Sequence, residues 1–292
     1  MSNKCLLIAD HKSVDKQIHI FNKNDFSYLT SIGNFGEGPE EITVMGCLAI
    51  DEAHHQLYVS DHAKQKIFSY DMDSVMVDSL YKPQVKTAMN ETLFPSEYQY
   101  INDTLSIAVL IKPTSTSTFN QFLGRWNMNT GEMIPMKYTH PDIQKKRITF
   151  AASEKAGIYV ECYTRHDLMT ICSLDGELLY NIYGPDWDGG NGNKLQSFGT
   201  VMIGNDKIFV SYCGEDYARD SFPTKILVFD LEGNYLKTLE TGYKISDCCY
   251  DSFNNRIILS LNDVVQFAYL DIDGIISVSY THLRAHETDS YL

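Results

Sequence analysis

The sequence predicts an all-β chain that folds as a six-bladed β-propeller of four-stranded antiparallel blades, incomplete at the termini. Three observations predict this fold: a turn motif that recurs six times, strands that are apolar on both faces, and a first repeat that begins partway through a blade. Propellers are built from radially repeated four-stranded sheets, and their repeats are typically about 40 to 50 residues long. No long amphipathic helical pattern interrupts the strands.

Each copy of the turn motif has an apolar strand end, a polar residue, a short turn and a return to apolar residues. The polar residues are Asn22, Asp71, Asn127, Ser173, Asp230 and Asp271. The steps between them are 49, 56, 46, 57 and 41 residues. A period near fifty with one hairpin per repeat is typical of propeller blades.

The second repeat shows the strands of one blade most clearly. We expect an inner strand over 47–51, a second over 56–61, a third over 66–70 and an outer strand over 76–81. Equivalent strands are expected around 106–110, 157–160, 207–210 and 256–261. Several are apolar on both faces, because a blade that is covered by neighbours on both sides buries both of its faces.

The two ends of the chain depart from this pattern. The segment 5–10 matches a second strand, so the first repeat lacks its inner strand, which the other terminus would have to supply. After Ile276 the pattern stops, and 277–292 resembles translated sequencing adapter. We therefore expect one propeller domain over 1–276 and a non-native tail over 277–292 that adds no regular strand.

Composition excludes several classes of function. The net charge of -14 repels phosphate backbones, so a nucleic-acid partner is not expected. No run of 18 apolar residues is present, so no membrane span is expected. The seven cysteines form no CxxC spacing, and no cofactor is expected. Cys162 and Cys172 lie on adjacent predicted strands, so a disulfide between them is an alternative to two buried thiols.

Ligands of propellers usually lie at the mouth of the central channel, on loops between second and third strands and between blades. A histidine follows a charged residue in three such loops, and the longest such loop, 213–223, adds aromatic and charged residues. The predicted ligand-binding cluster is Asp10, His11, Asp61, His62, Arg165, His166, Tyr217 and Arg219.

Two interpretations of these residues remain open. Converging imidazoles could bind a metal ion or act as a general base. Alternatively, Asp10 and Asp61 cap turns through side-chain hydrogen bonds, and the histidines are merely exposed. The Gly-Glu-Gly-Pro-Glu loop at 36–40 lacks the Lys-Ser/Thr pair of a phosphate-binding loop, so a tight crossing between blades is expected there. The loop 185–193 has a calcium-like composition but lacks the final glutamate of an EF-hand.

A family resemblance rests on the residues 31–71. Ser31-Ile32-Gly33-Asn34-Phe35-Gly36-Glu37-Gly38-Pro39-Glu40-Glu41 precedes an inner strand that ends in Asp51, and a Tyr-Val-Ser-Asp strand and an outer hairpin follow. This stretch resembles an NHL-type repeat, and its Gly-x-Gly-Pro-Glu form is similar to TolB-like six-bladed propellers, which are secreted or lipid-anchored.

The resemblance implies a non-enzymatic binding or interaction scaffold, periplasmic or on the cell surface, that acts as a monomer on a protein, peptide or carbohydrate ligand. The first residues contain no secretory signal, so this location implies a start upstream of Met1. Two alternatives remain: a metal-dependent propeller enzyme, lactonase-like hydrolase or lyase, acting at the channel mouth, and a cytoplasmic NHL-like interaction module.

Overall fold

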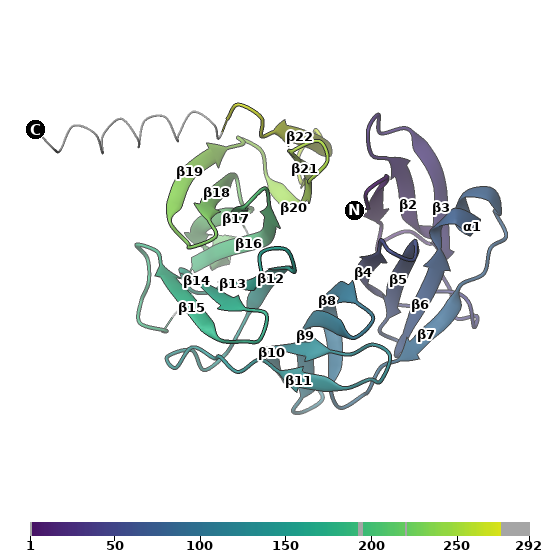
Figure 1. Ribbon diagram of the computed structural model, residues 1–292, viewed down its shortest axis with the longest axis horizontal. Coiled ribbons are helices and arrows are strands. Elements are labelled where there is room, and N and C mark those ends of the chain that lie inside the picture. The colour runs from purple at the N-terminus through teal and green to yellow at the C-terminus, as the bar shows by residue number, and fades with distance from the viewer. Residues whose placement is uncertain (1, 192–194, 220, 276–292) are drawn as a thin grey trace, which may run out of the picture. The chain divides into compact units, whose positions relative to one another are not determined.

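The computed structural model describes residues 2–191, 195–219 and 221–275. These residues form six antiparallel sheets, which are numbered here 1 to 6 in chain order (Figure 1). The chain divides into two compact units, Met1–Met136 and Lys137–Leu292, with three sheets in each. Each unit is described by itself.

The first unit contains sheets 1 to 3 and one short helix. Sheet 1 has three strands and sheets 2 and 3 have four each. The elements are β1 (Cys5–Ala9), β2 (Lys16–Asn22), β3 (Tyr28–Asn34), β4 (Met45–Asp51), β5 (Gln56–Asp61), β6 (Lys66–Asp71), α1 (Met72–Val77), β7 (Gln84–Ala88), β8 (Phe94–Asn102), β9 (Leu105–Pro113), β10 (Phe119–Trp126) and β11 (Met133–Pro135).

The second unit contains sheets 4 to 6. Sheets 4 and 5 have four strands each and sheet 6 has three. The elements are β12 (Ile148–Ser153), β13 (Ile158–Tyr163), β14 (Leu168–Ser173), β15 (Leu178–Tyr183), β16 (Leu195–Gly204), β17 (Lys207–Asp216), η1 (Tyr217–Arg219), β18 (Lys225–Asp230), β19 (Tyr235–Glu240), β20 (Ile245–Asp251), β21 (Arg256–Leu261) and β22 (Phe267–Asp271).

The strand order within every sheet follows the order of the chain, so each strand pairs with its sequence neighbours. This confirms the predicted antiparallel hairpins and the shortened first repeat among the described residues. The predicted second strands at 56–61 and 256–261 coincide with β5 and β21. The predicted domain boundary at Ile276 and the expectation for the tail lie outside the described residues.

The six copies of the turn motif share one hydrogen bond. In all six copies the side-chain oxygen of the polar residue accepts a backbone N–H from the turn that follows. The donors are the amides of Asn24, Ser74, Asn129, Glu177, Glu232 and Asp273. Asn, Asp and Ser favour turns because their short side chains can make this bond. In four copies the turn contains a glycine in a left-handed conformation, which glycine adopts without steric cost: Gly131 (φ 77), Gly176 (φ 87), Gly233 (φ 86) and Gly274 (φ 78).

The apolar cores lie between neighbouring sheets of one unit. Separate clusters of buried side chains join sheets 1 and 2, sheets 2 and 3, sheets 4 and 5, and sheets 5 and 6. All six residues of β13 are buried as a result. The strands are therefore apolar on both faces for the reason that the sequence predicted.

The expected outer strand over 76–81 is wrong. Residues 72–77 form the short helix α1, and the outer strand of sheet 2 is β7, further along the chain. Asp71 caps the helix, because its carboxylate accepts the backbone N–H of Ser74 at 2.7 Å. An N-cap of this kind satisfies a helix donor and outweighs the weak strand preference of the residues behind it.

The alternative of a disulfide between Cys162 and Cys172 is also wrong, since all seven cysteines are free thiols. In the register of β13 and β14, Cys172 lies opposite Tyr159 and Cys162 lies opposite Met169. Tyr159 and Cys162 are three residues apart on one strand, so the two thiols point to opposite faces of the sheet.

Across the described residues, no helix is long and apolar enough to cross a membrane.

Candidate functional site

One end of each four-stranded sheet collects the loops that could contact a ligand. Because neighbouring strands alternate in direction, the chain enters the sheet, turns from the second to the third strand, and leaves the sheet at the same end. We call this the loop end. All the predicted site residues belong to segments at the loop end of sheets 1, 2, 4 or 5.

In sheet 1, Asp10 stabilises the turn after β1. Its carboxylate accepts the backbone N–H of Lys12 at 3.0 Å, and His11 is exposed. Here the turn-capping interpretation holds.

In sheet 2, Asp61 is a buried structural carboxylate. It accepts four backbone N–H groups, those of Thr43, Val44, Ala63 and Lys64. The ammonium of Lys64, 3.7 Å from this carboxylate, also donates to the carbonyls of Gly36, Gly38 and Glu41. The Lys64 ammonium thus holds the Gly-Glu-Gly-Pro-Glu loop against sheet 2 by donating to its backbone carbonyls.

His62 is partly buried rather than exposed, contrary to the turn-capping interpretation. Its ring lies 6.2 Å from that of Phe94, and its Nε2 has no hydrogen-bond partner among the described residues. Burial lowers the pKa of the imidazole, an effect that the Asp61 carboxylate opposes. A Cβ at Gly46 would collide with this ring, so the glycine makes room for the histidine.

In sheet 4, His166 is buried and contacts two aromatic rings. The ring centres of Tyr163 and Trp187 each lie 6.1 Å from that of the imidazole. Its Nδ1 is buried and has no hydrogen-bond partner among the described residues. Burial lowers the pKa of His166, and the nearby carboxylate of Asp188 opposes this shift. Arg165, the preceding residue, is partly buried.

A second buried histidine, which sequence reasoning missed, completes this group. His140 lies in the segment that leads into sheet 4, which we call the linking segment (137–147), and it is 2% exposed. Its Nδ1 accepts the backbone N–H of Asp142, so Nε2 carries the proton and donates to the Tyr183 hydroxyl at 3.0 Å. Burial lowers the pKa of His140.

The Trp187 ring packs against both histidines and Tyr183. Its centre lies 5.4 Å from that of His140 and 5.0 Å from that of Tyr183. We call His140, His166, Tyr183 and Trp187 the sheet-4 cluster. The hydroxyl of Tyr183 accepts a hydrogen bond from His140 Nε2, so its own O–H stays available as a donor, and this residue is 49% exposed.

The linking segment is fastened along the outer strand β15 by side chains. Lys137 pairs with Glu177, the Tyr138 hydroxyl accepts from Asn181, and His140 donates to Tyr183. Further along, the Lys146 ammonium lies 2.8 Å from a Glu161 carboxylate oxygen inside the sheet, a pair with side chains only 7% and 1% exposed.

Asp167 supports the loop that carries Trp187. Its buried carboxylate accepts the backbone N–H of Asp186 at 3.0 Å, and burial raises its pKa. A Cβ at Gly184 would collide with this carboxylate, so a glycine is required there.

Of the fifth-sheet candidates, Tyr217 and Arg219 form the short helix η1 after β17. The Arg219 guanidinium pairs with Glu215 at 3.3 Å, and both side chains are exposed. The loop therefore contains an internal ion pair of the kind that contributes little to stability at a surface.

The eight predicted residues thus belong to two separate units. His11 and Arg219 are exposed, Asp10 and Asp61 hold turns, and His62 and His166 are packed side chains. Of the eight, only His166 belongs to the sheet-4 cluster, and Arg165 directly precedes it. A common site formed by all eight residues stays a prediction.

Sequence reasoning missed His140 and Tyr183 because no repeat position relates them. The linking segment has no strand pattern, and Tyr183, the partner of its His140, lies 43 residues further along the chain. One signal was present: Glu161 interrupts an otherwise apolar strand, and a buried carboxylate there requires a cation such as Lys146.

A group of possible metal ligands lies at the opposite end of sheet 2. Oxygen and nitrogen atoms of Asp51, His54 and Asp103 lie within 4.8 Å of one another. His54 Nδ1 already bonds Asp51 at 2.8 Å, which raises the pKa of the imidazole. This group is apart from the predicted loops.

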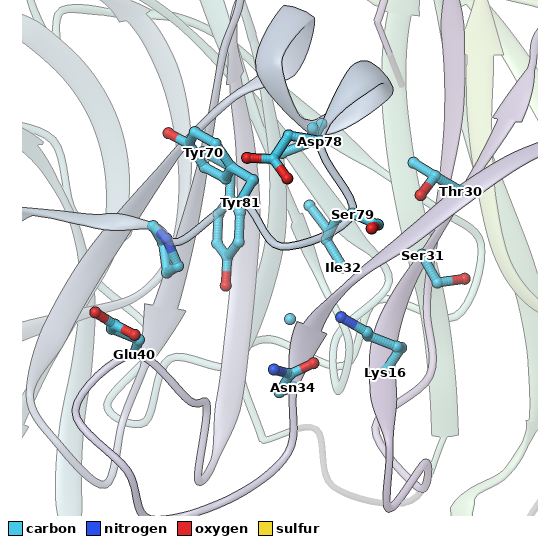
Figure 2. A pocket seen from close by; sticks show the side chains of 13 residues that line it. Lys16, Thr30, Ser31, Ile32, Asn34, Glu40, Tyr70, Asp78, Ser79 and Tyr81 are labelled. Atoms are coloured by element: carbon cyan, nitrogen blue, oxygen red, sulfur yellow. The ribbon is translucent and has the colours of Figure 1, made fainter.

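A small pocket in the first unit lies between β3 and the segment that follows α1 (Figure 2). Its volume of about 30 Å³ admits only a few water molecules, whereas ligand pockets measure roughly 300–1,000 Å³. Polar groups of Lys16, Asn34 and Glu40 surround it, and Glu40 pairs with Lys82 at 2.7 Å.

Comparisons with known proteins agree with this geometry. A sequence profile of the DUF5128 family, described as a 6-bladed beta-propeller, matches residues 1–122. With six antiparallel sheets in chain order, the match decides the fold. The chain is a six-bladed β-propeller. No curated protein matches the sequence significantly.

Solved structures are similar in fold. A member of the DUF4221 family from Bacteroides vulgatus has a TM-score of 0.57 at 10% identity, covering 93% of this chain and 100% of that one. A gluconolactonase from Xanthomonas campestris has 0.55 at 13%, covering 88% and 79%. A chain of the mitotic checkpoint complex has 0.54 at 8%, covering 93% and 74%. At these identities the similarity shows the fold alone.

Proposed function

We propose that this propeller is a non-enzymatic binding scaffold whose contact surface is the loop end of sheet 4. The observation that carries the proposal is the sheet-4 cluster, where a tryptophan, a half-exposed tyrosine and two histidines from three separate segments meet. Tryptophan, tyrosine and arginine dominate the energetics of protein interfaces. Arg165 lies in the adjoining turn.

The partner that best suits this surface is a protein or peptide. Tyr183 is half exposed, and the exposed residues Asp186 and Asp188 flank Trp187 in the loop after β15. A surface with aromatic rings and acidic groups suits a segment with apolar and basic side chains. The chain of the mitotic checkpoint complex is a precedent for a similar fold within a protein assembly.

We also propose that the protein acts outside the cytoplasm, in the periplasm or at the cell surface, as the resemblance to TolB-like propellers implies. Fractionation of cells that express the gene with its native upstream sequence tests this location. Recovery in the cytoplasmic fraction alone would contradict it.

The binding proposal is tested with a display library of random short peptides, selected on the full chain and then on a Trp187→Ala variant. Peptides enriched on the wild-type protein are synthesised and their affinities measured by fluorescence polarisation. We expect Trp187→Ala to weaken binding by about 2 kcal/mol, roughly 30-fold, as for an interface hot spot.

The matched control is Tyr235→Ala, which removes another exposed aromatic ring from the second unit, on the outer strand β19. It should leave the affinity unchanged. A library that yields no consensus, or peptides that bind both variants as well as the wild type, would overturn the proposal.

A further inference from the structure

The two histidines of the sheet-4 cluster are placed so that only their uncharged forms fit. His140 Nδ1 accepts the backbone N–H of Asp142 at 3.3 Å. A proton on Nδ1 would point at the backbone N–H of Asp142, and the hydrogen bond that Nδ1 accepts would be lost. His140 could then keep its charge only by leaving its position.

His166 has a different reason to be neutral. Its buried Nδ1 has no acceptor, and the rings of Tyr163 and Trp187 pack around it. A charged N–H without a partner in such surroundings is costly, because burial removes its hydration. The nearest relief is an outward turn toward the carboxylate of Asp188 or toward water.

Both histidines pack against the Trp187 ring. His140 belongs to the linking segment and also bonds Tyr183 at the end of β15, while His166 reaches the ring from the turn between β13 and β14. We propose that His140 and His166 form an acid-sensitive latch, which holds the Trp187 loop (184–190) and the linking segment against sheet 4 while uncharged and releases them on protonation. This inference does not depend on the proposed ligand.

Other charged groups around the latch set its response. From the linking segment Asp142 favours protonation of His140 and Lys146 opposes it, and from the loop after β15 Asp188 favours protonation of His166. Each histidine also disfavours the charge of the other. Other ionisable groups of the elements packed around the latch include Lys137, Tyr138, Lys145, Arg147, Glu161, Tyr163, Arg165, Asp167, Tyr180, Tyr183 and Asp186.

The direction of the pH effect follows from burial, which lowers the pKa of both histidines below the ordinary value of about 6.5. The latch is therefore closed at neutral pH and opens below that value. Asp167 has the opposite effect on the latch. Burial raises the pKa of its carboxyl, and protonation removes the cost of burying a charge, so acid favours the folded position of this side chain.

Trp187 reports the state of the latch directly, because the chain has only two tryptophans and the other is Trp126, in the first unit. The full chain is titrated from pH about 7.5 to about 5, around the ordinary imidazole pKa, while tryptophan emission is recorded. A Trp187→Phe variant supplies the contribution of Trp126 for subtraction. We expect the Trp187 emission to shift to the red in one step with a midpoint below about 6.5.

The variant His140→Gln/His166→Gln should lose this step, because neither glutamine titrates. His54→Gln is the matched control, since it removes an exposed histidine from the first unit and should leave the step in place. A step that persists in the double variant would assign the titration to other groups and overturn the proposal. So would the absence of a step before global unfolding in the wild-type protein.

Hydrogen exchange of the wild-type chain provides a readout that needs no variant. After correction for the intrinsic pH dependence, amides of 184–190 and of the linking segment should exchange about tenfold faster at the acidic end, where the latch is open, than at neutral pH. The strands of sheets 5 and 6 should keep their rates. A uniform acceleration of both units would instead indicate global unfolding and contradict the latch.

Discussion

Lys64 shows how one side chain can hold a loop without any regular structure. Its ammonium donates to two backbone carbonyls of the Gly-Glu-Gly-Pro-Glu loop and to that of Glu41, which follows it, and lies beside the buried Asp61 carboxylate. The loop carbonyls gain a cationic donor, and the carboxylate gains a counter-ion. The same residues that resemble a phosphate-binding loop in sequence are thus organised around an internal cation.

We expect Lys64→Met to lower the free energy of unfolding by about 2 to 4 kcal/mol, because it leaves three carbonyls without their donor and Asp61 without its counter-ion. Denaturant titration followed by circular dichroism measures the loss. Lys12→Met, at an exposed position in the turn of sheet 1, is the control and should change stability by less than about 0.5 kcal/mol. Equal losses in the two variants would contradict a structural role for Lys64.

At the same scale, sequence reasoning identified residues better than it identified their roles. Asp61 and His62 were recognised as an equivalent pair, yet Asp61 accepts four amides and His62 fills a space beside Gly46. Repeat position reveals which residues correspond. It does not reveal whether a side chain points into a turn or toward solvent, because that depends on contacts with residues that are distant in sequence.

At the scale of elements, the six polar turn residues explain why the hairpins could be predicted. Each accepts a backbone N–H within a few residues, so the interaction is local and leaves a signal in the sequence. The one copy that misled the prediction is Asp71. It accepts an amide as the others do, but the turn continues into α1 instead of a strand.

Asp230 offers a direct test of this role in the hairpin of β18 and β19. Its carboxylate accepts the backbone amides of Glu232 and Asn234 and bonds the Asn234 side chain. We expect Asp230→Ala to destabilise the protein by about 1 kcal/mol, the net worth of a typical hydrogen bond. Thermal unfolding measures the change. Asp230→Asn keeps an acceptor oxygen and should recover most of the loss; a loss equal to that of the alanine variant would contradict the role.

The contacts of the linking segment with sheet 4 could not be predicted from the sequence. Its contacts with β15 use side chains only at Lys137, Tyr138 and His140, and no turn motif or strand pattern accompanies them. These contacts hold the segment beside β15, although most residues of that strand stay exposed. The sheet-4 cluster follows from them, since the segment brings His140 to Tyr183 and Trp187.

For the whole molecule, the pH dependence of stability has a defined sign. Burial lowers the pKa of His62, His140 and His166, so the unfolded chain binds more protons than the folded chain between the folded values and about 6.5. The stability that these histidines contribute is therefore present above about 6.5 and is lost as the pH falls. His54 acts in the opposite direction, because its bond to Asp51 raises its pKa.

Three buried histidines outweigh exposed His54 and the single carboxyl of Asp167, whose raised pKa also opposes them, so we expect the melting temperature to fall as the pH drops from about 7.5 to about 5.5 across the imidazole range. Differential scanning calorimetry at matched ionic strength measures the change. The variant His54→Gln should show a steeper fall, since it removes the opposing contribution. A melting temperature that rises on acidification would contradict the assignment of buried neutral histidines.

The fold as a whole was the most predictable property, because the period, the two-sided apolar strands and the local turns all reflect interactions between neighbours in the sequence. The candidate surface was less predictable for the opposite reason. Tyr183 and Trp187 meet His140 and His166 only after a sheet has formed and a linking segment has folded over it. No local sequence pattern therefore predicts the contacts among these four side chains.

The strictly sequential strand order has a kinetic consequence. Every sheet pairs strands that follow one another in the chain, so forming a sheet closes only local loops and does not wait for a distant part of the chain. A nascent chain can thus complete one sheet for roughly every fifty residues that leave the ribosome, at the spacing of the repeats. Strand pairing can therefore keep pace with synthesis, whereas the apolar faces of a new sheet stay exposed until the neighbouring sheet of its unit forms.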